Sequence, residues 1–150
     1  MNSAASELQS TVNKYLPLLQ NLDEEKSSYK PAPHKWSKKE LIGHLIDSAQ
    51  NNIRRFIVSQ YEEKPTIVYK QDDWVRINHY QSYSLSDLIQ LWYLLNQQVC
   101  TILNHSSTEV LQRKSQTESL HTIEWLAVDY IKHMKHHLHQ ILDMTPIAYP

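Results

Sequence analysis

Glycine is almost absent from this chain. Gly43 is the single glycine among 150 residues, whereas the tight turns of β-hairpins usually need glycine at positive φ. This composition therefore favours α-helices joined by longer loops over a sheet with many hairpins. A chain of 150 residues is also long enough to bury one hydrophobic core. We predict an all-α fold in a single domain that spans residues 1–150.

Charge and cysteine content exclude several classes of protein. The formal net charge is −1, and no long run of one sign attracts nucleic acid. Cys100 is the single cysteine, so no internal disulfide can form and a reducing compartment is expected. The first residues do not have the pattern of a secretory signal, and no apolar run approaches the ~20 residues that span a bilayer. We expect a cytoplasmic protein with no nucleic-acid or membrane partner.

Four long segments have the apolar periodicity of amphipathic helices. The first covers residues 3–22, although Pro17 inside it should kink or split the helix. The second follows Ser37, which forms a capping box with Glu40, and continues to about residue 60. The third follows Ser84. The fourth runs from about residue 122 to about residue 143.

The connections between these segments differ in length. Residues 27–35 form an extended linker, because each proline biases the residue before it away from a helix. Residues 61–83 form a loop whose length is uncommon in a compact domain and is often functional. Residues 104–121 are polar, with one short turn near residues 109–112. The pattern predicts a four-helix bundle with a long crossover connection between helices 2 and 3.

Histidine is concentrated near the end of the chain, with four of the nine histidines in residues 133–139. His133 and His137 lie at the edge of the apolar stripe of the fourth helix. A step of four residues turns only ~40° around a helix, so these two rings share a face. His136 and His139 align instead with charged positions, and we expect them to face solvent or the rim. Periodicity thus selects one pair from four histidines.

A metal held by this pair needs a third ligand from another element, because a catalytic zinc site typically has three protein ligands and an open position. His44 lies between Leu41 and Leu45 and borders the buried stripe of the second helix. Gly43 next to it costs roughly 1 kcal/mol in a helix, and its missing side chain lets a neighbouring helix approach closely. Hydrogen-bonded core histidines or a solvated histidine face are the alternatives, and both remain open at this point.

Several segments together resemble one known family. The segments are Trp36-Ser37, residues 43–48 (Gly-His-Leu-Ile-Asp-Ser), Arg55-Phe56, the stretch from Pro65 to Trp74, and residues 133–141 (His-Met-Lys-His-His-Leu-His-Gln-Ile). In order and spacing they resemble the DinB-like superfamily, and within it the YfiT-like branch of metal-dependent hydrolases and bacillithiol transferases. The resemblance covers most of the chain. Gln71 departs from the pattern, because relatives often have an acidic residue there.

This resemblance has implications for fold, metal and activity. It implies a four-helix bundle with a long crossover, frequently as a homodimer. It also implies a divalent metal, zinc or nickel, held by three histidines that map to His44, His133 and His137. The implied activity is thiol S-transfer or hydrolysis on a small-molecule substrate, with a low-molecular-weight thiol as one partner.

The mechanistic hypothesis needs acid–base groups near the metal. An ion held by three neutral imidazoles lowers the pKa of a bound water to about 7, or binds a thiol as the thiolate. Asp47, one turn beyond His44, is predicted to orient a ligand ring or accept a proton, and Asp73, between Asp72 and Trp74, to cover the open coordination position. The plainer interpretations are a solvated carboxylate and a surface turn.

Other functions stay open on the sequence alone. The chain is alternatively a non-catalytic metal-binding helical dimer, in which the metal is structural or the site has decayed. A fourth protein ligand, such as His34 or His79, would favour that alternative. Arg54 and Arg55 are candidates for holding an anionic substrate group. Core or interface roles are expected instead for Trp36, Trp92, Trp125 and Cys100.

Overall fold

The computed structural model describes residues 2–150, and Met1 lies outside the described residues. Most of the chain is in four long helices: α1 Ser3–Gln20, α3 Lys38–Val58, α5 Leu85–Asn104 and α7 Ile123–Ile141. Shorter elements join them: α2 Glu24–Ser28, α4 Gln71–Asn78, a 3-10 helix Tyr80–Ser82, α6 Thr108–Leu111, and the strands β1 Lys114–Gln116 and β2 Leu120–Thr122.

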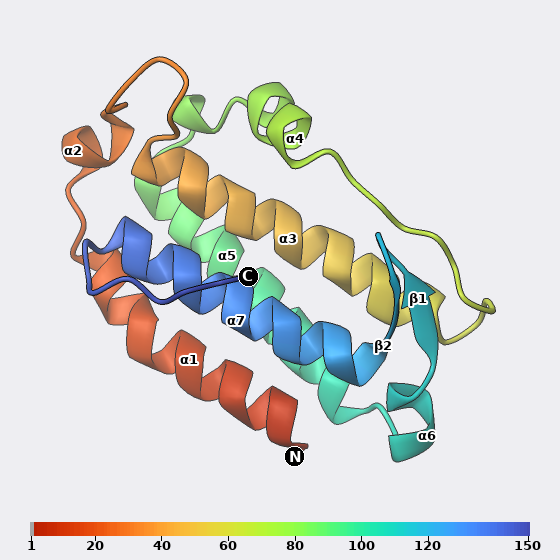
Figure 1. Ribbon diagram of the computed structural model, residues 1–150. Helices are drawn as coiled ribbons and strands as arrows, with labels where there is room; N and C mark the ends of the chain where they lie inside the picture. The colour runs from red at the N-terminus through yellow and green to blue at the C-terminus, as the bar shows by residue number, and fades with distance from the viewer. Residues whose placement is uncertain (1) are drawn as a thin grey trace.

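The four long helices form a four-helix bundle (Figure 1). Helix α3 packs against α5 and α7, and α1 packs against the same two helices. Residues 59–84 connect α3 to α5 as a long crossover that carries α4 and the 3-10 helix. The all-α bundle with a long crossover between its second and third long helices is therefore confirmed.

The helices begin at the caps that the sequence indicates. Ser37 accepts a hydrogen bond from the backbone N–H of Glu40, and the Glu40 side chain accepts one from the N–H of Ser37, which completes the predicted capping box. Ser84 caps α5 by accepting from the N–H of Asp87. These bonds satisfy backbone donors that have no partner inside the helix.

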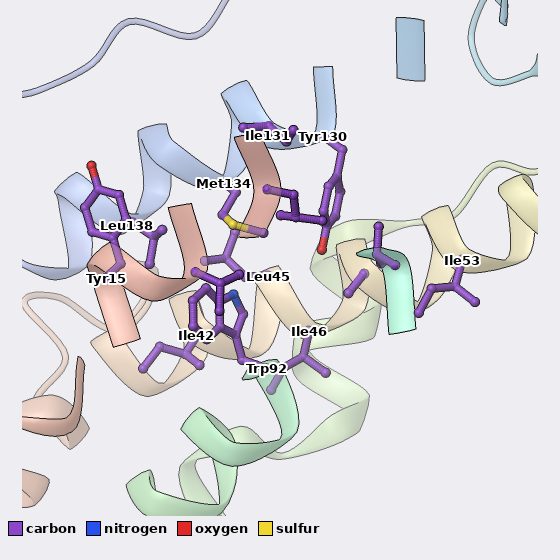
Figure 2. Packing of buried hydrophobic residues seen from close by; sticks show 14 of the residues in the cluster. Tyr15, Ile42, Leu45, Ile46, Ile53, Trp92, Tyr130, Ile131, Met134 and Leu138 are labelled. Atoms are coloured by element: carbon purple, nitrogen blue, oxygen red, sulfur yellow. The ribbon is translucent and has the colours of Figure 1, made fainter. Parts of the chain in front are cut away.

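The core lies between the four helices and contains large apolar side chains from each of them. Figure 2 shows labelled side chains of α3, α5 and α7 pointing into this space. Trp92 of α5, Phe56 of α3 and Met134 of α7 are almost completely buried there. Burial of such side chains drives folding at about 25 cal/mol per Å² of apolar surface, and it brings α3 and α7 together.

Pro17 does not split the first helix, which runs uninterrupted through it to Gln20. The proline has no N–H to donate to the carbonyl group of Asn13, one turn earlier. Asn13 and Pro17 are both exposed, so water can satisfy that carbonyl group. The expected extended linker also begins later than predicted, because Ser27 and Ser28 still belong to α2.

Two connections contain structure that the sequence pattern did not indicate. The loop predicted at residues 61–83 contains α4 and the 3-10 helix. The polar segment after α5 contains the expected turn as α6, and then a small antiparallel hairpin in which Ser115 pairs with His121. The strands have three residues each, and β1 also pairs with Thr66 of the crossover. Such short strands depend on tertiary contacts, which local periodicity does not reveal.

No helix formed by residues 2–150 combines the length and the apolar character that a membrane crossing requires.

Candidate metal centre

Three histidines from two helices come together inside the bundle, and we call them the three-histidine cluster: His44, His133 and His137. One side-chain nitrogen from each lies within 4.8 Å of the others. The Nε2 atoms of His44 and His133 are 3.0 Å apart. Helix α3 supplies the first histidine and α7 the other two, one helical turn apart. The structure therefore brings together the three residues that the sequence selected.

Burial keeps the three imidazoles neutral. His44 is only 1 % exposed, and its desolvation, followed by the charge of His137, lowers its pKa to about 4. Desolvation first, and the neighbouring histidines second, lower the pKa of His133 to about 3. The pKa of His137 is also lowered, mainly by desolvation. Neutral imidazole is the form that binds a metal.

The cluster fits a divalent cation. Two nitrogen ligands at 2.0–2.1 Å from a tetrahedral zinc ion lie about 3.3 Å apart, close to the 3.0 Å between the two Nε2 atoms. Nδ1 of His137 is 3.0 Å from Oε1 of Gln140, so this nitrogen donates and the lone pair is on Nε2. The Nε2 atoms of His44 and His133 can share one proton in a hydrogen bond, and a cation between them would take the place of that proton. Imidazole suits both zinc and nickel.

Because the three imidazoles are already neutral, metal binding at pH 7 should release close to no protons from this cluster. A metal site usually releases protons as its ligands bind, and histidines with an ordinary pKa near 6.5 would release a fraction of one each. Isothermal titration calorimetry with Zn²⁺ in buffers of different ionisation enthalpy measures that number. The same titration at pH 6 is decisive, because three histidines of pKa about 6.5 would there release about two protons together, whereas a bound water of pKa about 7 stays mostly un-ionised. Release of more than one proton per ion at pH 6 would contradict the lowered pKa values.

Gln140 orients the ring of His137 from outside the cluster. We expect Gln140→Ala to weaken metal binding by about tenfold, at the low end of the range for outer-shell partners, because Gln140 is exposed and water can replace its oxygen. Gln140→Glu retains an acceptor and should keep the wild-type affinity. Competition with a chromophoric chelator measures both variants, and equal losses in the two would exclude this role.

Asp47 is buried one turn after His44, with no exposed surface. Its Oδ1 accepts hydrogen bonds from the hydroxyl group of Tyr80 and from Nδ2 of Asn78. Its Oδ2 has no partner among the described residues. Desolvation raises the pKa of Asp47 to about 6, and the bond from Tyr80 opposes part of that rise. The carboxyl group therefore titrates close to neutral pH.

Gly43 allows a close approach, but the element that uses it is the crossover and not another long helix. The ring of Tyr80 lies against this glycine, where an added Cβ would come 2.0 Å from Cδ2 of the ring. The same ring then reaches Asp47 with its hydroxyl group. Gly43 thus allows the 3-10 helix to dock on α3.

The other predicted residues occupy different surroundings. Asp73 lies in α4, partly exposed, and pairs with Arg76 at 3.0 Å. Neither His34 nor His79 belongs to the three-histidine cluster in the part of the chain that the structure describes. Trp36 packs on His44 with ring centroids 5.0 Å apart. Cys100 is buried, and burial raises its pKa to about 11, which suits a packing residue.

A cavity of about 370 Å³ opens beside the cluster, with His133 in its wall. Arg55 also lines it and donates from Nε and Nη2 to the carbonyl oxygen of Ile67, whereas Arg54 is exposed. The ring of Trp125 stacks on that of His121 at 3.5 Å between centroids, and both border the cavity. Trp125 is 47 % exposed, so it is not the core anchor that the sequence suggested.

Sequence reasoning missed several residues of this wall. Tyr69, Thr117, Asp129 and Tyr149 line the cavity with His133. They come from the crossover, the hairpin, α7 and the segment after α7. No spacing rule connects positions so far apart in the chain, although the aromatic residues of the long crossover were a signal to look there.

The fold and the cluster together define a class of protein: a four-helix bundle in which three histidines from two helices meet beside a cavity. The chain belongs to the DinB superfamily, whose sequence profile matches residues 7–141. Among curated proteins, none shows significant similarity to the sequence.

Solved structures show the same fold. YfiT from Bacillus subtilis, described as a probable metal-dependent hydrolase with an unusual four-helix bundle topology, is similar with a TM-score of 0.82 and 20% identity over 95% of this chain and 87% of that one. The DinB-like protein YjoA from Bacillus subtilis has a TM-score of 0.66 and 20% identity, over 99% of this chain and 98% of that one.

A mycothiol-dependent maleylpyruvate isomerase is also similar in fold, with a TM-score of 0.70, 13% identity and coverage of 98% of this chain. This chain spans 63% of the isomerase's length. TM-scores of 0.66–0.82 establish a shared fold, whereas at identities of 13–20% the activity needs its own argument from the site.

Proposed function

We propose that this protein is a metal-dependent enzyme in which His44, His133 and His137 hold one divalent ion, zinc or nickel. The observation that carries the proposal is the convergence of three neutral imidazoles beside an open cavity. Such an ion supplies a nucleophile at neutral pH, from water or from a thiol. Three histidine ligands leave a coordination position free for it.

We propose small-molecule chemistry, namely transfer of a low-molecular-weight thiol to an electrophile, or hydrolysis. The relatives in fold support both reactions, since one is described as a probable metal-dependent hydrolase and another depends on the thiol mycothiol. The cavity size of about 370 Å³ is at the lower end of small-molecule sites. Within it, Arg55 offers a cation and the His121–Trp125 stack offers an aromatic surface.

The non-catalytic alternative, a metal-binding helical dimer with a structural or decayed site, has less support. A structural site is normally closed by a fourth protein ligand, and the cluster has three members among the described residues. An open cavity at His133 serves a substrate better than a structural ion. The dimer and the cytoplasmic location remain predictions from the sequence.

A conjugation assay tests the proposed activity. Zinc- and nickel-loaded protein is incubated with cysteine or glutathione and the electrophile 1-chloro-2,4-dinitrobenzene, and hydrolysis is followed in parallel with a p-nitrophenyl ester. We expect metal-dependent turnover in one of the two assays, absent from the His137→Ala variant. Equal rates for wild type and variant in both assays would favour the non-catalytic alternative.

We retain an acid–base role for Asp47 as part of the proposal, because a group with a pKa of about 6 can give and take protons near neutral pH. Asp47→Asn should lower kcat by about 100-fold with metal content unchanged. Tyr80→Phe, which removes a hydrogen bond but keeps the carboxyl group, is the matched control. An Asp47→Asn variant with wild-type kcat and reduced stability would assign this residue a structural role. The covering role of Asp73 rests on the sequence alone.

A further inference from the structure

The chain reverses direction after α7 and runs back along that helix, as the terminal segment in Figure 1 shows. We call residues 143–150 the strap. Asp143 makes the reversal with a φ of 54°, a conformation that aspartate adopts more readily than most residues. The strap forms no helix or strand of its own, so side chains of the bundle determine where it lies.

Two histidines that do not belong to the three-histidine cluster hold the strap. Nδ1 of His139 is 2.7 Å from the carbonyl oxygen of Thr145, and Nδ1 of His136 is 2.5 Å from that of Ile147. A carbonyl oxygen only accepts, so both Nδ1 atoms donate. Nε2 of His139 is then free to accept from the hydroxyl group of Tyr15, 2.6 Å away.

The four histidines of residues 133–139 therefore divide into two pairs. His133 and His137 point toward His44, with ring centroids 4.9 Å from it in both cases. His136 and His139 lie on another face of α7, as predicted, but they are only partly exposed because the strap covers them. One pair can serve a metal, and the other positions a segment of chain.

The strap brings Tyr149 to the wall of the cavity beside the cluster. The hydroxyl group of Tyr149 donates to Oδ2 of Asp129 at 2.8 Å. Its ring lies 5.3 Å from that of His133, centroid to centroid, at 67°. Tyr149 therefore packs against a candidate metal ligand in the wall of the cavity.

We propose that Tyr149, held in place by the strap, is a specificity-determining residue that limits the size of the molecule able to reach the three-histidine cluster through the cavity. The inference rests on the proposed function, because it concerns ligands of the same site. The ring contributes a wall, and the bonds from His136 and His139 to the strap keep the wall in position. A larger ligand must displace the ring or the strap to enter.

Cobalt makes ligand entry visible without an activity assay. The full chain is loaded with Co²⁺, and 2-mercaptoethanol, cysteine and glutathione are titrated as probes of increasing size, with the thiolate-to-cobalt charge-transfer band as the readout. In Tyr149→Ala, we expect affinity for glutathione relative to 2-mercaptoethanol to rise by about tenfold, as for other changes of pocket size. Tyr61→Ala removes a tyrosine that is 68 % exposed and is not among the residues that line this cavity, so its affinity ratio should equal that of the wild type.

A conservative variant separates shape from hydrogen bonding. Tyr149→Phe keeps the ring and loses the bond to Asp129, so its affinity ratio should change less than that of Tyr149→Ala. Equal changes in the two variants, or an unchanged ratio in Tyr149→Ala, would overturn the size argument. A thiolate-to-cobalt band that appears in Tyr149→Ala but not in the wild type would support the size argument. The absence of this band from both proteins would overturn the size argument.

The strap itself is tested by His136→Ala, which removes the bond to Ile147 and leaves Tyr149 unchanged. This variant should shift the affinity ratio in the same direction as Tyr149→Ala, with cobalt content unchanged. A wild-type ratio would overturn the role of the strap. The cobalt content of the wild type is measured first: if the wild type binds no cobalt, the proposed function fails together with this inference, whereas normal cobalt content with unchanged ratios overturns the inference alone.

Discussion

His44→Ala should abolish stoichiometric metal binding, from about one ion per chain in the wild type to almost none. The substitution removes the ligand that α3 supplies and leaves two histidines one turn apart on α7. We expect affinity to fall by well over the 10- to 100-fold that is typical for loss of an outer-shell partner. Elemental analysis after loading with Zn²⁺ or Ni²⁺ and desalting measures the loss.

The control separates loss of the ligand from loss of the fold. His105→Ala removes an exposed histidine whose Nδ1 contacts the carbonyl oxygen of Thr101, far from the cluster in the chain, and should keep full metal content. Circular dichroism should show the same helix content in both variants, because His133, whose Nε2 loses its partner when His44 is removed, lines the cavity, where water can replace the lost contact. Unchanged metal content in both His44→Ala and His137→Ala would refute the metal assignment.

Gly43→Ala should destabilise the protein by about 1–3 kcal/mol, the usual cost of overpacking. In a helix whose glycine faces open space, the same substitution would stabilise the protein by roughly 1 kcal/mol. The sign of the stability change therefore depends on the residue that packs against the glycine. That neighbour is the ring of Tyr80, 3 % exposed and too close to accommodate a Cβ. Because the ring is buried and bonded to Asp47, it cannot move aside cheaply. Urea unfolding of the metal-free protein measures the change.

A double-mutant cycle isolates this contact. In the Tyr80→Ala background the space above Gly43 is open, so Gly43→Ala should now be neutral or stabilising. Destabilisation of the same size in both backgrounds would mean that the clash is not with Tyr80. Gly43→Ala should also weaken docking of the crossover, which an increase in proteolysis near residues 78–83 would report.

Local rules account for much of the bundle and for two of the three histidines in the cluster. Ser37 and Glu40 form their capping box within four residues of chain, so the sequence was sufficient to place the start of α3. Likewise, the choice of His133 and His137 over His136 and His139 follows from the 3.6-residue period of a helix with one buried face. Pro17 shows the limit of such rules, because the exposure of Asn13, one turn earlier, lets α1 continue.

The rest depends on contacts between distant parts of the chain. His44 meets α7 because α3 and α7 share a core, and the resemblance to a known family indicated this pairing where spacing did not. The wall of the cavity combines Tyr69, Trp125 and Tyr149, three residues from three different connections or helix ends. The segments that carry or adjoin these residues include the short strands β1 and β2. Such short strands are stable only when they pack on the finished bundle, so no local pattern predicts them.

By itself, the sequence determined that the chain forms helices, where they begin, and which two histidines of α7 face inward, since hydrogen-bond periodicity and capping act over a few residues. Only the tertiary structure decided that Tyr80 lies on Gly43, that His136 and His139 bind the strap, and that a cavity opens at His133. The contact of Tyr80 with Gly43 and the cavity wall depend on packing between segments far apart in the chain, and the strap bonds depend on the chain reversal after α7. In each case shape and not sequence spacing selects the partner.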